Sequence, residues 1–83
     1  MEELKLLKLS LTNLMHNLKE FKEYKEVLIQ EHYDNMNYTF NAIDINFLEE
    51  VFNREMSHIE RDIENLEAEI LKVETKIMIL EER

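Results

Sequence analysis

The side chains of this 83-residue chain that could do chemistry are 3 histidines and 19 carboxylates. Glu55 and His58 have the Glu-x-x-His spacing that, in di-iron helical bundles, sets two ligands on one inward face. A di-iron site needs two such motifs and further inward carboxylates, whereas this chain has a single one. No carboxylate is flanked by a sequence that predicts an apolar pocket around it. We therefore expect no metal site, no cofactor and no catalytic residue, and hence no enzyme.

The composition excludes several structural classes. Gly, Pro, Cys and Trp are all absent. Without Gly and Pro the chain lacks the residues that most readily form tight turns, which disfavours a β-rich fold. Without Cys it can form neither a disulfide nor a thiolate metal site. We therefore expect an all-α protein.

The charge balance bears on the partners. Lys and Arg number 10 against 19 acidic residues, so the net charge of −9 repels nucleic acid and anionic lipid alike. The longest apolar run, at positions 77–80, is far shorter than the roughly 20 residues needed to span a bilayer. Glu2 and Glu3 stand where a secretory signal carries basic residues. We expect a soluble, cytoplasmic protein that contacts neither membrane nor nucleic acid directly and binds another protein, for which a basic surface is the natural match.

Apolar residues recur at alternating spacings of three and four in two segments, a heptad pattern typical of helices that pack along one seam. A polar stretch rich in Asn and Asp separates the two segments. The pattern predicts one helical-hairpin domain over 1–83, with helices at about 2–32 and 43–82 and an irregular bend at about 33–42. Asn41 or Asp44 is the expected N-cap of the second helix. The predicted seam consists of Leu4, Leu7, Leu11, Leu14, Leu18, Phe21, Met56, Ile59, Ile63, Leu66, Ile70 and Val73.

An antiparallel register with Leu4 opposite Val73 pairs all twelve seam residues. It also places Lys8 near Glu67 or Glu74, so that the charges beside the seam attract. The same register puts Lys25 opposite Phe52 and Leu28 opposite Glu49, and it leaves Ile77 and Leu80 beyond the start of the first helix. Other apolar residues remain outside the seam, and a two-helix hairpin buries little surface. We therefore expect self-association, with a homodimer favoured, into a four-helix arrangement.

Two groups of residues are candidate partner-binding sites. The first surrounds the bend, where five of the seven aromatic residues lie. These aromatic rings either form a small core that closes the hairpin or serve as a docking surface. The second group is an acidic run on one side of the second helix, which is either a solvated face or a mimic of a nucleic-acid backbone. The candidates are Tyr33, Met36, Tyr38, Phe40 and Phe47 at the bend and Glu60, Asp62, Glu64, Glu67 and Glu69 in the acidic run.

Two functions follow from these features. The first is a non-enzymatic protein–protein interaction module, a small acidic helical-hairpin adaptor or regulator that self-associates and binds a protein partner. The alternative is a small acidic inhibitor that blocks a basic nucleic-acid-binding cleft. Anti-restriction, anti-CRISPR and immunity proteins of phages and mobile elements work partly in this way, and the analogy is one of size and charge.

Overall fold

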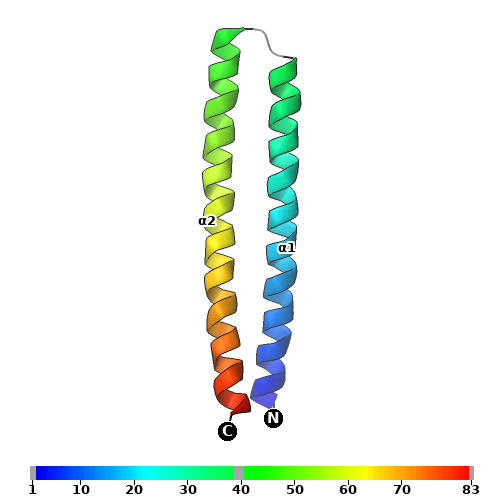
Figure 1. Ribbon diagram of the computed structural model, residues 1–83, viewed down its shortest axis with the longest axis vertical. Helices are drawn as coiled ribbons and strands as arrows, with labels where there is room; N and C mark the ends of the chain where they lie inside the picture. The colour runs from blue at the N-terminus through cyan, green and yellow to red at the C-terminus, as the bar shows by residue number, and fades with distance from the viewer. Residues whose placement is uncertain (1, 39–40, 83) are drawn as a thin grey trace.

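Two antiparallel helices make up the computed structural model, which describes residues 2–38 and 41–82. Helix α1 spans Glu2–Asn37 and helix α2 spans Ala42–Glu81. The helices lie side by side along a rod of 63 × 15 × 14 Å, and both chain ends lie at the same end of the rod (Figure 1). The predicted all-α helical hairpin is confirmed. We call the end that holds the connection between the helices the closed end and the other the open end.

Local sequence explains where α2 begins. The backbone of Asn41 is extended, with φ −88° and ψ 125°, and its Oδ1 accepts a hydrogen bond of 2.9 Å from the Ile43 N–H. This bond satisfies one of the amide groups that a helix start leaves without a partner. Asp44 lies in the first turn, where a negative charge is favourable near the helix N-terminus. Of the two expected N-caps, Asn41 is the one observed.

Helix α1 is longer than the sequence predicts. It continues to Asn37, five residues beyond the predicted end at 32. The first half of the segment predicted as a bend, 33–42, is therefore more than one further turn of α1. Asn and Asp in a helix cost only a few tenths of a kcal/mol each, and burial of apolar surface offsets that cost. Met36 is half-buried on this last turn, and Gln30 Nε2 donates to Asp34 Oδ1 at 3.2 Å. The predicted end of α1 is wrong because the turn propensity of Asn and Asp is weaker than the packing of the last helical turn.

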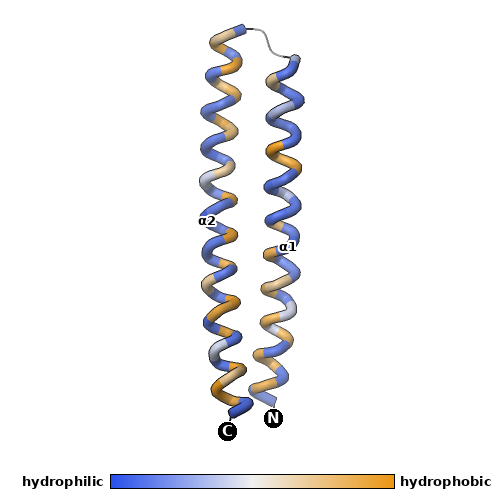
Figure 2. The backbone as a smooth tube through the Cα atoms, in the orientation of Figure 1, coloured by the Kyte–Doolittle hydropathy of each residue, from blue (hydrophilic) through white to orange (hydrophobic). Residues whose placement is uncertain are grey.

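A single apolar seam joins the helices. All twelve predicted seam residues are buried or half-buried, and Figure 2 shows apolar segments recurring along both helices between hydrophilic ones. Within the described residues, α2 contributes five of the six buried side chains and α1 contributes Leu28 alone. None of the described side chains is completely withdrawn from solvent. The seam is therefore a shallow core, more exposed along α1 than along α2.

The pairing of the helices differs from the predicted register by about one heptad. Phe52 stacks on His32 instead of facing Lys25, seven residues earlier. The Lys8 ammonium lies 3.1 Å from the carboxylate of Glu81, one heptad beyond Glu74. At the closed end the first turn of α2 extends past the end of α1, as Figure 1 shows.

Burial at the two ends of the seam explains this shift. A slide of seven residues keeps the same residues in the seam, because the pattern repeats every seven residues. The predicted register left Ile77 beyond the start of α1 and placed Leu28 opposite Glu49. In the structure both apolar side chains are buried, with exposed fractions of 9% for Ile77 and 8% for Leu28. Full burial of an aliphatic side chain contributes about 1.5–3 kcal/mol, so these two contacts favour the observed register.

Cysteine pairs test the register directly, because the chain has no native Cys. The double variant His32→Cys/Phe52→Cys should cross-link within one chain through a short reagent with two thiol-reactive groups, since the centroids of the two native rings lie 3.9 Å apart. The matched pair Lys25→Cys/Phe52→Cys should react poorly, because seven residues of helix displace the first thiol by about 10 Å. Mass spectrometry of the monomeric product reads out both yields. Preferential cross-linking of the Lys25 pair would show that the observed register is wrong.

The Asn41 cap gives a second prediction. Asn41→Ala should lower the free energy of unfolding by about 1 kcal/mol, the usual cost of losing an N-cap side chain. Urea denaturation followed by circular dichroism measures the change. Asn53→Ala is the control, because Asn53 is exposed inside α2 and alanine is the better helix former there. Equal stability of the Asn41 variant and the native chain would contradict the capping role.

Candidate protein-interaction surfaces

The aromatic residues of the closed end are exposed. The exposed fractions are 63% for Tyr33, 84% for Tyr38 and 64% for Phe47. Among the described aromatic residues of the predicted group, Phe52 alone is half-buried. The described rings therefore form no closing core, because α1 and α2 run as regular helices up to the connection and carry these rings on their outer sides. Phe40 lies outside the described residues.

His32 is the partner of Phe52, and the sequence interpretation missed it. The two rings are stacked, with centroids 3.9 Å apart and planes inclined by 10°. Both residues are half-buried and continue the seam toward the closed end. Lys25 occupies a seam position, and His32 follows it by seven residues. Continuing the heptad pattern past Leu28 therefore places His32 in the seam. The fading of the apolar pattern hid this position, because an imidazole takes the place of an aliphatic side chain.

A hollow of about 530 Å³ lies beside this aromatic stack. Ile29 and Tyr33 of α1 and Met56 of α2 contribute to its wall, together with the stacked rings. Met36, another candidate from the sequence, is half-buried one turn farther toward the closed end. The closed end thus combines exposed aromatic rings with a hollow that a partner side chain can enter.

The acidic run lies along both edges of the seam instead of on one side of α2. Glu67 borders a hollow that includes Leu18 and Leu71. Asp62 and Glu69 border a different hollow, beside Phe21. Glu60 and Glu64 share the edge of Glu67 by their heptad positions. The expectation of one strongly negative side is therefore wrong, because residues two apart on a helix point in different directions.

Helix α2 carries most of the negative charge. Its 11 acidic and 4 basic residues give a net charge of −7, whereas α1 has 7 acidic residues and 5 lysines, a net charge of −2. Glu60 pairs with Lys25 at 3.5 Å and Glu69 with Lys72 at 3.3 Å. The remaining carboxylates of the acidic run are exposed and make no ion pair within the described parts of both helices. Their charges are available to a partner.

Over residues 2–38 and 41–82, no three His, Asp or Glu side chains gather in a way that could hold a metal ion. Glu55 and His58 are both exposed on α2. No polar or charged side chain of the described residues is buried. Neither described helix is apolar over a length that could cross a membrane. The described surface consists of open faces and shallow hollows.

Comparisons with protein-family models, with curated proteins and with solved structures found no match to this chain.

Proposed function

We propose that this chain is a non-enzymatic protein–protein interaction module, an acidic helical-hairpin adaptor or regulator that self-associates and binds a protein partner. One observation carries the proposal: many large apolar side chains are exposed outside the seam. Contact with another polypeptide is the usual way in which a protein removes such apolar side chains from water. The exposed residues are Leu6, Leu9, Met15, Tyr24, Val27, Tyr33, Tyr38, Ile43, Phe47, Leu71, Met78 and Ile79.

The shape of the molecule supports this proposal. The radius of gyration is 18.7 Å, whereas a compact domain of this length would have about 12 Å. A rod two helices wide cannot enclose these side chains by itself. Binding to another polypeptide removes such surface from water, and each Å² of apolar surface buried contributes about 25 cal/mol of favourable free energy. Association is therefore the natural source of further stability.

The closed end is the proposed surface for the protein partner. Tyr38 and Phe47 are among its most exposed rings, on opposite sides of the connection between the helices. Aromatic residues are enriched among the few interface residues that contribute most binding energy, because they bring a large contact area at a small entropic cost. The hollow beside the His32–Phe52 stack adds a concave element to this surface.

Substitution of the exposed rings tests the binding surface. A photo-crosslinking side chain at position 38 identifies the partner in extracts of the encoding organism, and calorimetry with the purified partner then measures affinity. Tyr38→Ala/Phe47→Ala should weaken binding by about thirtyfold or more, because truncating one interface anchor costs about 2 kcal/mol. The helical content should stay unchanged, because both rings are exposed.

Leu6→Ala/Leu9→Ala is the matched control, because it removes two similarly exposed apolar side chains near the open end. This variant should bind the partner as the native chain does. Equal loss of binding by the control variant, or full binding by Tyr38→Ala/Phe47→Ala, would contradict the closed end as the partner site.

The net charge of −7 on α2 favours a second candidate function, the acidic inhibitor of a basic nucleic-acid-binding cleft. Asp62→Lys/Glu69→Lys discriminates between the two functions. An adaptor that binds through the closed end should retain its partner within about threefold, because exposed charges contribute little to affinity. A cleft inhibitor should lose binding strongly, with an affinity that falls steeply as salt rises.

A further inference from the structure

One face of the hairpin carries a row of positive charges beside a row of negative charges. All five lysines of α1 occupy heptad positions on or beside the same edge of the seam, and the acids of α1 lie elsewhere apart from Glu23 and Glu26. The adjoining edge of α2 carries glutamates at every turn or two. We call this surface the lysine–glutamate face. Its charged residues are Lys5, Lys8, Lys19, Lys22, Glu23, Lys25 and Glu26 on α1 and Glu60, Glu64, Glu67, Glu74 and Glu81 on α2.

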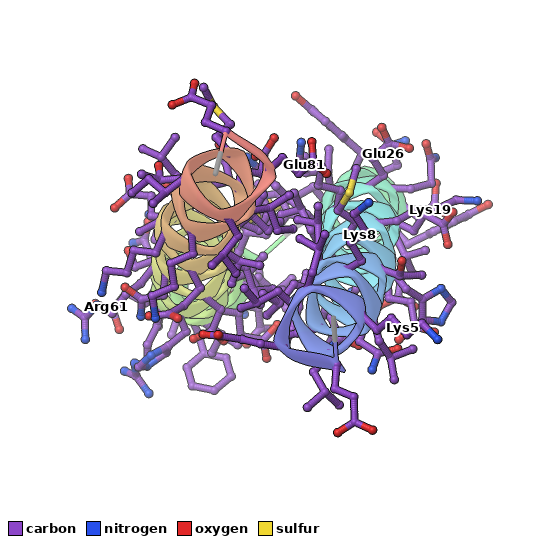
Figure 3. All side chains as sticks on the ribbon, turned by 90° about the horizontal axis from the view of Figure 1, so that it is seen from below. Lys5, Lys8, Lys19, Glu26, Arg61 and Glu81 are labelled. Atoms are coloured by element: carbon purple, nitrogen blue, oxygen red, sulfur yellow. The ribbon has the colours of Figure 1, made fainter. Side chains whose placement is uncertain are left out.

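Two ion pairs show that the two rows adjoin. Lys8 reaches Glu81 at 3.1 Å near the open end, and Lys25 reaches Glu60 at 3.5 Å farther along the rod. Figure 3, a view along the rod, shows Lys8 and Glu81 directed toward one another, with Arg61 on the far side of α2. Lys19 and Lys22, and Glu64, Glu67 and Glu74 opposite them, form no ion pair within residues 2–38 and 41–82.

Apolar surface fills the middle of this face. A hollow of about 340 Å³ is bordered on α1 by Met15 and by two lysines and two glutamates, and it reaches Ile70 of α2. The charged residues at its border are Lys19, Lys22, Glu23 and Glu26. A second hollow, of about 500 Å³, is bordered by Glu67 and Leu71 of α2 and reaches Leu18 of α1. Both hollows include Leu18 and Ile70, so they adjoin across the seam. Met15 and Leu71 flank them and are 55% and 66% exposed.

We propose that a second copy of this chain covers the lysine–glutamate face, with the two-fold axis of the dimer parallel to the rod. Rotation about this axis lays α1 of each copy against α2 of the other, in antiparallel orientation and at the same height. The lysine row of each copy then faces the glutamate row of the other, so that the dimer has two equivalent contacts between oppositely charged rows. Met15 of one copy meets Leu71 of the other, because both lie beside Ile70 at one height of the rod. The product is a four-helix bundle.

Charge selects this arrangement over the other ways of stacking two hairpins. A two-fold axis perpendicular to the rod, in the plane of the hairpin, would lay α1 on α1 and α2 on α2, so that lysines face lysines and glutamates face glutamates. The opposite face of the hairpin carries acids on both helices, among them Glu20 and Glu31 of α1 and Glu55 and Asp62 of α2. It also carries Lys72 and Lys76 of α2, so acids outnumber lysines there, and Lys72 already pairs with Glu69. Stacking through that face would bring like charges together, which costs several kcal/mol across an interface.

The exposed area suits an interface of this kind. The chain exposes 6754 Å², whereas a compact monomer of its mass would expose about 5,300 Å². The excess of about 1,400 Å² exceeds the roughly 800 Å² that each partner buries in a standard protein–protein interface. A second copy can therefore cover the middle and the open end of this face and leave Tyr38 and Phe47 at the closed end uncovered.

Light scattering on a sizing column tests the charge pairing. The native chain should have twice its monomer mass of 10.2 kDa. Lys19→Glu/Lys22→Glu and Glu64→Lys/Glu67→Lys should each dimerise at least a hundredfold more weakly, because each variant sets like charges face to face. Both should keep full helicity by circular dichroism, because these side chains form no ion pair within the described hairpin. An equimolar mixture of the two variants should recover the dimer, because the reversed rows are complementary.

Thiol cross-linking between chains tests the orientation. A mixture of Met15→Cys and Leu71→Cys chains should form mixed disulfide dimers on mild oxidation, and either chain alone should form few. A native monomer, or charge variants that remain dimeric, would overturn the proposal, as would preferential linkage of Met15→Cys chains to one another. The inference rests on one part of the proposed function, the self-association of the chain. Partner binding at the closed end is measured separately with the Tyr38 and Phe47 variants, so either claim can fail without the other.

Discussion

Packing along one seam between two helices is the interaction on which the whole structure depends. A helix has four unpartnered amide groups at its start and gains little stability from its own hydrogen bonds in water, so α1 and α2 require each other. The seam consists of aliphatic side chains at heptad spacing, with the His32–Phe52 stack at its closed end. Since none of the described side chains is completely buried, the seam alone is a thin core. Because so thin a core buries little apolar surface, many apolar side chains remain exposed beside the charged ones.

The charges beside the seam contribute little to the stability of the fold, and in the proposed dimer they select the orientation of the second copy. The ion pairs Lys8–Glu81 and Lys25–Glu60 involve side chains that are between a third and somewhat over half exposed, and exposed pairs contribute at most about 1 kcal/mol each. The larger effect comes from the charges that the hairpin does not pair. Lysines and glutamates of the two rows that form no ion pair within the described hairpin are complementary to those of a rotated copy. Such a face favours one two-fold arrangement and disfavours the others.

The sequence predicts the fold class and the seam residues and narrows the N-cap of α2 to Asn41 or Asp44, because these features depend on local chemistry and on the heptad repeat. It does not determine the register, since a slide of seven residues returns an equivalent pattern and burial of Leu28 and Ile77 at the ends decides between the alternatives. It also underestimates the length of α1, because packing of the last helical turn outweighs the turn propensity of Asn and Asp. The candidate site is only partly predictable. The group of rings at the bend is visible in the sequence, but their exposure and the role of His32 depend on tertiary structure.

Thermal unfolding over a hundredfold range of protein concentration tests the central claim most directly, because association that completes a thin core links stability to concentration. If two hairpins complete one another's core, Tm measured by circular dichroism should fall steadily on dilution, and the unfolding curves should fit a transition from folded dimer to unfolded monomer. A Tm that stays constant over the whole range would contradict the account, because it would show that one seam between two helices is sufficient by itself.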